Sequence, residues 1–382
     1  MVNYTFKEFK TVLNKLKFPD SWFWCKYTIN PYSGCEHACI YCDARSNRYY
    51  LKEIQDFENE IIIKTHVDKK LDLRIKRARS LLPDVVAMGG VNDAYQPIEL
   101  KAKNTQKILK VFAKYKFPVS ISTKSNLFTR DIDLFNKIAT DTWFTIAVSI
   151  TTMNEELSRF LEPFSSTPQE RLDALKKVKE NAPNVQVGVN LMPVIPYICD
   201  SKENMEEIVR KSKEIDINFV LFGGLTLRDS QKDFFIEKLK NSKYKNFIHP
   251  LLDLYSGNKN IWSDYSKKLN KKILDLHKRY KISIRTKRWI PNKEDYRKWN
   301  YKISELLLNK EYNNSLKTGK HNRNMMWAGL NLNNLEESIM DVYKRGELSK
   351  LQNFKQAVID IVKPYLDKTK EVKQKIGLDK FL

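Results

Sequence analysis

The chain has 382 residues, of which 42% are hydrophobic and 12% aromatic, so it can bury at least one large core and is not a disordered protein. Its 68 Lys and Arg outnumber its 46 Asp and Glu, which gives a formal net charge of +22. It has no apolar run of about eighteen residues and no charged-then-apolar leader, so we expect no membrane span, no secretion signal and a location in the reducing cytoplasm.

The N-terminal part leads into a loop rich in cysteine. Residues 1–22 are predicted to form an extension that carries an amphipathic helix over 6–16. A strand-like run over 23–29 and a Pro-Tyr-Ser-Gly turn follow, and then come Cys35, Cys39 and Cys42. Thiolates are soft ligands that select iron–sulfur clusters, zinc or Cu(I), so these residues predict a metal site rather than disulfides.

The spacing of these cysteines favours an iron–sulfur cluster over zinc. Structural zinc usually takes two separated ligand pairs, and no second pair follows the loop, so only His37, Cys25 and Cys199 are available to complete a zinc site. Three thiolates on a four-iron cluster instead leave one iron open to bind a reactant. We expect His37 to face solvent and Cys25 to lie in the core.

Strands and helices alternate after the loop. A helical segment is expected over 44–50, a strand or extended connector over 60–64, and a helix over 67–81. Further strands are expected over 84–88, 118–122, 144–150, 185–191 and 219–222, with helices over 101–115, 129–140, 168–181 and 202–216. About six strand–helix units predict an α/β fold, a partial (β/α)6 TIM-like barrel over 23–230.

Polar residues follow the ends of the predicted strands. The strand-to-helix loops of a parallel barrel open on one side, so these residues should share one rim with the cysteines. Alternatives stay open for these residues. Lys124 could be a surface lysine, and the two glycines could form a tight turn in any fold. Asp93 could cap a helix or contact a substrate. The rim candidates are Gly89, Gly90, Asn92, Asp93, Lys124, Ser125, Ser149, Thr151, Thr152, Arg159, Met192, Pro193 and Cys199.

Six segments of the chain, in this order, resemble the radical SAM superfamily of S-adenosylmethionine (SAM) enzymes, and within it the proteins related to spore photoproduct lyase. The C-x3-C-x2-C spacing, with aromatic Tyr41 before the third cysteine, carries the most weight. The resemblance extends over about residues 20–230. The segments are 30–42, 93–99, 121–125, 148–152, 161–163 and 193–196.

The resemblance implies a [4Fe–4S] cluster on Cys35, Cys39 and Cys42, whose open iron would chelate the amino and carboxylate groups of SAM. One electron from a reductant such as ferredoxin or flavodoxin would then cleave SAM to methionine and a 5′-deoxyadenosyl radical that abstracts hydrogen from a substrate. Gly89 and Gly90 would meet the methionyl amino group, Lys124 and Ser149 would hold the carboxylate, Tyr41 would lie against the adenine, and Arg159 joins them as a cofactor-binding candidate.

Two departures from the lyase pattern argue against photoproduct reversal. The loop over 89–99 lacks the cysteine that returns a hydrogen atom in spore photoproduct lyases, and Asp43, rather than an aromatic residue, follows Cys42. Cys199 is a candidate hydrogen donor, although a free cysteine is more often a small buried hydrophobe.

Residues 231–382 are predicted to form a basic, mainly helical region, with 34 Lys and Arg against 17 Asp and Glu. The segment over 277–299 interleaves cations with aromatics, including Trp289 and Trp299, as single-stranded nucleic-acid sites do. Alternatively, it is a solvated face whose two tryptophans pack back onto the barrel. Helices are expected over 233–239, 265–280, 296–308, 335–342 and 351–365, with a short strand over 282–285.

Two functions therefore remain open. The first is a radical SAM enzyme with an unassigned substrate, for which nucleic acid is the first candidate because of the positive charge. The second is a non-catalytic nucleic-acid-binding protein that zinc or a cluster merely stabilises.

Overall fold

The computed structural model describes residues 2–49, 53–54, 56–292 and 294–378. The chain forms two compact units, of which the first contains Met1–Leu16 and Cys25–Lys287 and the second contains Lys17–Trp24 and Arg288–Leu382. The ranges expected from the sequence, 1–22, 23–230 and 231–382, divide the chain differently and stay a prediction. No described helix is both long enough and apolar enough to span a membrane.

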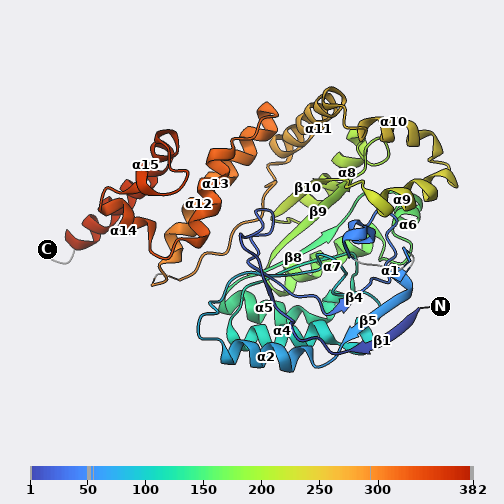
Figure 1. The fold of residues 1–382 in the computed structure, drawn as a ribbon, viewed down its shortest axis with the longest axis horizontal. Coiled ribbons are helices and arrows are strands. Elements are labelled where there is room, and N and C mark those ends of the chain that lie inside the picture. The colour runs from blue at the N-terminus through green and yellow to red at the C-terminus, as the bar shows by residue number, and fades with distance from the viewer. Residues whose placement is uncertain (1, 50–52, 55, 293, 379–382) are drawn as a thin grey trace. The chain divides into compact units, whose positions relative to one another are not determined.

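A seven-stranded sheet organises the first unit (Figure 1). Its order is β10-β9-β8-β7-β6-β3-β2, and all neighbours are parallel except β2 and β3. The six parallel strands confirm the predicted α/β fold of partial-barrel type. The strands are β2 (Asn14–Lys15), β3 (Tyr27–Thr28), β6 (Val86–Met88), β7 (Val119–Thr123), β8 (Phe144–Ser149), β9 (Gln186–Val194) and β10 (Phe219–Gly224).

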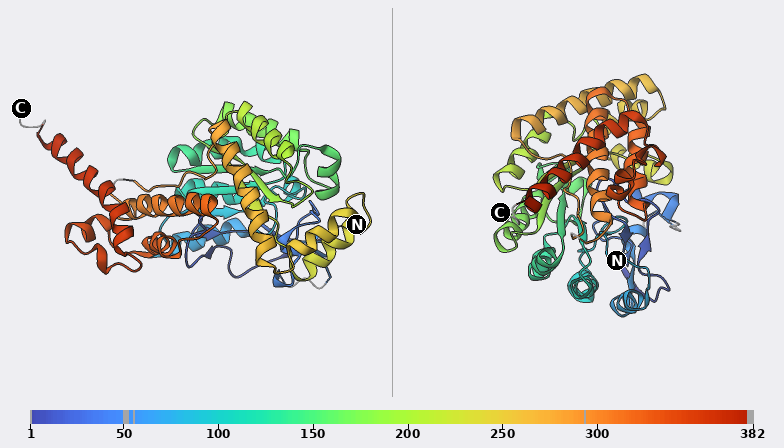
Figure 2. Two further views of the ribbon diagram at one scale, coloured as in Figure 1. Left: turned by 90° about the horizontal axis from the view of Figure 1, so that it is seen from above. Right: turned by 90° about the vertical axis from the view of Figure 1, so that its left-hand side faces the viewer.

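Helices cover the outer side of this sheet, as parallel strands require. Helices α2, α4, α5 and α7 lie side by side in Figure 1, and the right-hand view of Figure 2 shows several helices end-on. β8 is buried along its whole length, and Thr167 and Glu170 form a capping box that starts α7. The helices are α2 (Val67–Arg77), α3 (Glu99–Ala102), α4 (Asn104–Tyr115), α5 (Ile132–Asp141), α6 (Glu155–Leu161), α7 (Pro168–Asn181) and α8 (Lys202–Glu214), with the 3-10 turn η3 (Leu127–Asp131).

Three more helices of the first unit follow the last strand: α9 (Asp229–Lys240), α10 (Ile248–Leu254) and α11 (Lys259–Tyr280), with the 3-10 turn η4 (Lys245–Phe247) between the first two. α11 packs against α8. Ser283 forms a single parallel bridge with Phe219, so the strand expected over 282–285 is reduced to one pair.

The N-terminal helix predicted over 6–16 is wrong. Residues Asn3–Lys7 form the strand β1, which pairs in parallel with β5 (Glu60–Lys64), and β4 (Tyr32–Ser33) pairs with the other edge of β5. The apolar spacing of this segment fits a helix locally, but the open edge of β5 satisfies its backbone N–H and C=O groups instead. The strand predicted over 60–64 is confirmed.

The segment after the cysteines is helical only in short turns. η1 (Asp43–Arg45) and η2 (Asn47–Tyr49) are 3-10 turns, and α1 (Asp56–Asn59) leads directly into β5. The helical segment predicted over 44–50 is thus present in part, and residue 50 lies outside the described residues.

The second unit is helical, as predicted for the end of the chain. Trp289, which the sequence offered as a base-stacking residue, is 8% exposed, and its ring centroid lies 6.2 Å from that of Tyr301. It is therefore buried, but this ring partner belongs to the second unit and not to the barrel. Trp299 packs partly buried against the core of this unit. The elements are α12 (Arg297–Thr318), α13 (Arg323–Asn331), η5 (Leu332–Asn334), α14 (Ile339–Lys344), η6 (Leu348–Lys350) and α15 (Gln356–Leu378).

Candidate metal and cofactor site

The three cysteines of the loop are free thiols gathered in one buried place. Cys35 and Cys39 are each 6% exposed, and Cys42 keeps partial exposure. Two tight turns bring them together, because Ala38 N–H donates to the Cys35 carbonyl and Cys42 N–H to the Cys39 carbonyl, both at 3.3 Å. Burial raises the pKa of all three thiols, that of Cys39 to about 12, and the charges of neighbouring thiols add to the effect.

Two flanking segments hold this loop in place. Arg45 Nε donates to the Cys39 carbonyl at 3.0 Å, and Gln231 Nε2 donates to the Tyr41 carbonyl at 2.9 Å. The guanidinium of Arg45 lies over the rings of Phe57, at 4.9 Å, and Phe234, at 4.3 Å. The loop backbone is therefore anchored by side chains from η1 and α9, and its shape does not depend on a bound ion alone.

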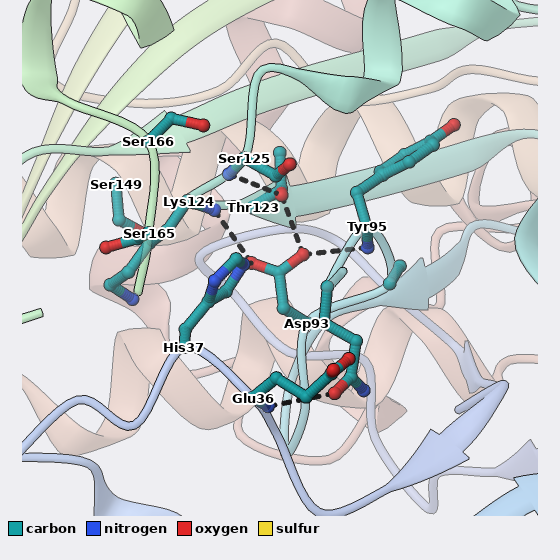
Figure 3. A network of polar contacts seen from close by, with 12 residues as sticks. Glu36, His37, Asp93, Tyr95, Thr123, Lys124, Ser125, Ser149, Ser165 and Ser166 are labelled. Atoms are coloured by element: carbon teal, nitrogen blue, oxygen red, sulfur yellow. Dashed lines mark hydrogen bonds and ion pairs between the residues drawn. The ribbon is translucent and has the colours of Figure 1, made fainter. Parts of the chain in front are cut away.

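A buried ion pair ties the cysteine loop to the ends of two neighbouring strands (Figure 3). His37 is 3% exposed, and its Nε2 lies 3.3 Å from Oδ2 of Asp93, which follows β6. Asp93 also accepts hydrogen bonds from the Thr123 hydroxyl and from the backbone N–H groups of Tyr95 and Lys124. Burial acts to raise the pKa of Asp93, but the charge of His37 and these donors lower it to about 2.

The expectation that His37 faces solvent is therefore wrong, because the Asp93 carboxylate draws its ring inward. Both oxygens of Asp93 are engaged by protein groups, so it joins the loop to β7 and does not cap α3.

The half-buried Lys124 and the buried Tyr41 and Glu162 form a second group beside the thiols. Lys124 Nζ lies 5.7 Å from the centroid of the Tyr41 ring, and the Tyr41 hydroxyl donates to Oε1 of Glu162. Burial acts to lower the pKa of Lys124, but the charges of Cys39 and Glu162 raise it above its ordinary value. A charged amine is thus held among the thiols.

A fully buried arginine connects this group to the sheet. Arg171, on α7, is 0% exposed, and its Nη2 lies 2.6 Å from Oε2 of Glu162. Its Nη1 donates to the carbonyl of Ser149, the last residue of β8, at 2.6 Å. Burial acts to raise the pKa of Glu162, but Arg171 and Lys124 hold it below its ordinary value, so the carboxylate stays charged. The Arg171 guanidinium therefore holds both the end of β8 and Glu162, the residue that accepts the Tyr41 hydroxyl.

The remaining candidates lie around this group. Ser149 is 8% exposed, and Cys199 is fully buried in one apolar cluster with Cys39 and Tyr41. Burial raises the pKa of Cys199. Arg159, on α6, donates from Nη1 to the carbonyls of Pro163, at 2.9 Å, and Ser165, at 3.3 Å. These positions put the candidates near one rim without testing their roles.

The two glycines after β6 serve different purposes. Gly89 has a φ of +95°, and a Cβ there would lie 2.1 Å from the Ser122 carbonyl oxygen in β7. Gly90 borders open space, because a Cβ there would meet no atom within 4 Å. Close packing of two strands requires the first glycine, whereas the second leaves room for a ligand.

Replacing Gly89 by alanine should lower the free energy of unfolding by about 2 kcal/mol or more, because the substitution adds a left-handed backbone penalty to a steric overlap. The matched Gly90→Ala variant should change it by less than about 1 kcal/mol. Urea denaturation followed by circular dichroism measures both. An equal loss in the two variants would contradict the distinction.

Three buried polar atoms near the strand ends have no hydrogen-bond partner among the described residues. They are Oδ1 of Asn92, after β6, Oγ1 of Thr151, after β8, and Oδ1 of Asn190, in β9 opposite Ser149. An unsatisfied buried polar group costs about 1–3 kcal/mol, so each of these atoms would gain from a polar ligand.

The donor set fits an iron–sulfur cluster. Three buried or half-buried thiols with raised pKa values need a strong cationic partner to become thiolates, and iron provides one. Within the described ranges, no three His, Cys, Asp or Glu side chains are arranged to hold a single metal ion. A four-iron cluster takes each thiolate on a different iron. Open space borders Gly90, where a Cβ would meet no atom within 4 Å.

The comparison with protein families agrees with this site. Residues 29–205 match the model of the radical SAM superfamily. The match includes all three cysteines of the loop, Gly89, Gly90, Lys124, Ser149 and Cys199. The chain belongs to the radical SAM superfamily, whose members are typically enzymes.

Relatives come from distant organisms. The chain is 32% identical over 224 residues to an uncharacterized protein of Methanocaldococcus jannaschii, which covers 58% of this chain and 78% of that protein. It is 29% identical over 260 residues to an uncharacterized protein of Mycobacterium tuberculosis, and the match covers 68% of this chain and 75% of that protein. A solved mutant of spore photoproduct lyase shares the fold with a TM-score of 0.52 at 14% identity, covering 72% of this chain and 79% of that chain.

Sequence reasoning missed two residues that organise the site. Glu162 lies in a segment that supported the family resemblance, but no role was assigned to it. Arg171 gave no signal at all, because it stands in the charged run Gln-Glu-Arg-Leu-Asp, which is typical of a solvated helix face. Only the packing of α7 on β8 shows that its side chain is buried.

Proposed function

We propose that this protein is a radical SAM enzyme that holds a [4Fe–4S] cluster on Cys35, Cys39 and Cys42 and reductively cleaves SAM. The observation that carries the proposal is the position of three thiols, two buried and one half-buried, beside the charged Lys124, at the ends of parallel strands in a partial barrel. When bound, such a cluster supplies the electron that splits SAM into methionine and a 5′-deoxyadenosyl radical.

The surrounding residues supply binding and orientation. Lys124 offers a compact cation to the SAM carboxylate, with Ser149 beside it as a hydroxyl donor. The Tyr41 ring, held through its hydroxyl by Glu162, offers a stacking face to the adenine. Gly89 shapes the turn and Gly90 leaves room for the methionyl amino group. Arg159 stays a cofactor-binding candidate, and a one-electron donor such as ferredoxin or flavodoxin would reduce the cluster.

The proposed chemistry differs from photoproduct reversal. The loop over 89–99 has no cysteine, and Asp43 pairs with Arg228 at 2.5 Å where the lyases place an aromatic ring. Cys199 shares an apolar cluster with Cys39 and Tyr41, which supports it as a candidate hydrogen donor near the site. The substrate is unassigned, and nucleic acid is the first candidate.

The alternative of a structural zinc site is weakened, because His37 is not free to act as a zinc ligand. Both ring nitrogens of His37 face protein partners, since Nε2 lies 3.3 Å from Asp93 and Nδ1 lies 3.1 Å from the Phe164 carbonyl. A ring nitrogen that binds zinc needs a free lone pair, so a tetrahedral site that includes His37 would have to break this arrangement.

Anaerobic purification followed by iron and sulfide analysis tests the proposal. We expect a brown protein with about four iron and four sulfide per chain, and 5′-deoxyadenosine after incubation with SAM and dithionite. A colourless protein with one zinc per chain and no 5′-deoxyadenosine would instead support the non-catalytic binding protein.

A further inference from the structure

A row of four aromatic rings lies between α11 and the loop after β9, within the first unit. The ring centroids of Tyr197 and Tyr265 are 6.1 Å apart, those of Tyr265 and Trp262 are 6.2 Å apart, and those of Trp262 and Tyr255 are 5.5 Å apart. Trp262 is 44% exposed and Tyr197 is 37% exposed, whereas the other two rings are half-buried. The two half-buried rings thus support two rings that face solvent.

The row borders a cavity of about 520 Å³, which has charged groups on its wall. Lys268 and Lys272, on α11, line it together with Asp200 and Asp264. Asp264 is paired with Lys267 at 3.6 Å, and Asp200 accepts a hydrogen bond from the Tyr197 N–H at 3.0 Å. The cavity therefore combines flat apolar faces, ammonium groups and carboxylates that accept hydrogen bonds.

The row lies in a basic part of the chain. Residues 231–287 hold 15 Lys and Arg against 5 Asp and Glu, and α11 alone holds 7 against 2. The second unit, which contains 17–24 and 288–382, holds 20 against 13. The region from α9 to α11 is therefore a basic part of the first unit to which a polyanion would be attracted.

The row is also built onto the proposed SAM site. Tyr255 packs against the apolar cluster that contains Cys39, Tyr41 and Cys199, and its hydroxyl donates to the Leu225 carbonyl at 2.6 Å. Tyr197 precedes the buried Cys199 by two residues and has a φ of +65°, a conformation that costs a non-glycine residue about 1–2 kcal/mol. In this backbone conformation the loop keeps Cys199 buried and leaves the Tyr197 ring exposed to solvent.

We propose that this row, defined by Tyr197, Trp262 and Tyr265, is a docking site for single-stranded nucleic acid, which is the substrate class of the neighbouring radical site. Bases stack on the two exposed rings, the lysines of α11 contact the phosphates, and the Asp200 and Asp264 carboxylates suit the exocyclic amino groups of bases. The statement that the nucleic acid is a substrate rests on the proposed function. The proposed binding site does not depend on that function. A duplex hides the base faces, so it should bind more weakly.

The test is fluorescence anisotropy of the anaerobically purified full chain with a labelled twelve-nucleotide single strand of mixed sequence. We expect binding that weakens as salt rises, and a loss of about tenfold in affinity for Trp262→Ala and for Tyr197→Ala, because one stacked base is removed in each. The matched control is Trp327→Ala, which removes an exposed tryptophan of the second unit and should bind like the original chain. Circular dichroism and thermal melting check that the variants are folded.

Several results would overturn the proposal: no binding at low salt, equal affinity for the duplex, or an equal effect of Trp327→Ala. Stronger binding to vesicles with anionic lipid than to the single strand would overturn it in favour of a membrane surface. 5′-Deoxyadenosine formation by the original chain is measured separately. Its absence would reject the proposed enzyme without affecting the anisotropy result, and so the two failures are distinguishable.

Discussion

Replacing Cys39 by alanine should abolish formation of 5′-deoxyadenosine and reduce bound iron to a small fraction of that in the original chain. Cys39 is buried, lies between the other two thiols in the loop, and shares the neighbourhood of Lys124. With two thiolates left, the cluster loses one of its three anchors. Iron analysis and the product assay on anaerobic protein measure the two effects.

The matched control is Cys25→Ala, which removes another buried thiol but lies before β3 and outside the loop. We expect this variant to keep its iron and to form 5′-deoxyadenosine, with a modest loss of stability. Full iron content and activity in Cys39→Ala, or equal loss in both variants, would reject the assignment of the loop as the cluster site.

Replacing Arg171 by methionine should lower the free energy of unfolding by about 3–5 kcal/mol, the cost of breaking a buried ion pair by removing one partner. The guanidinium is 0% exposed, and its loss leaves the Glu162 carboxylate without its 2.6 Å partner in the interior. The carbonyl of Ser149 also loses its donor. Chemical denaturation of the variant and of the original chain measures the difference.

The double variant Arg171→Met with Glu162→Gln should recover part of the lost stability, because the buried charge that had become unpaired is removed as well. Glu162→Gln alone should be less damaging than Arg171→Met, since a neutral amide tolerates burial better than an unpaired carboxylate. A loss below about 1 kcal/mol for Arg171→Met would show that solvent or Lys124 already compensates for the guanidinium.

The position of the charge changes the interpretation of the C-terminal half. The sequence assigned the excess of Lys and Arg to residues 231–382 as one region, and it singled out the segment over 277–299. The structure divides that region at Lys287 and buries Trp289 against Tyr301. The exposed rings that accompany the basic helix α11 are Tyr197 and Trp262 of the first unit instead. They are 65 residues apart in the chain, so no local motif reveals them.

The sequence by itself determined the class of the protein. The regular alternation of apolar strands with helices predicted the partial barrel. The segment with the three-plus-two spacing of Cys35, Cys39 and Cys42, together with five further matching segments, indicated the family. Both signals are local, because a metal loop is set by residues a few positions apart and a buried strand by a continuous apolar run. The glycine pair and Lys124 were found in the same way, since each follows a recognisable strand.

Only the tertiary structure decided how the site is held. His37 turns inward because Asp93, 56 residues later, offers a charge. Asn3–Lys7 becomes a strand because the edge of β5 is open to it. Arg171 is buried because α7 packs on β8 over Glu162. In each case the partner is distant in sequence, and the free energy comes from satisfying buried polar groups and charges, which no local pattern of residues records.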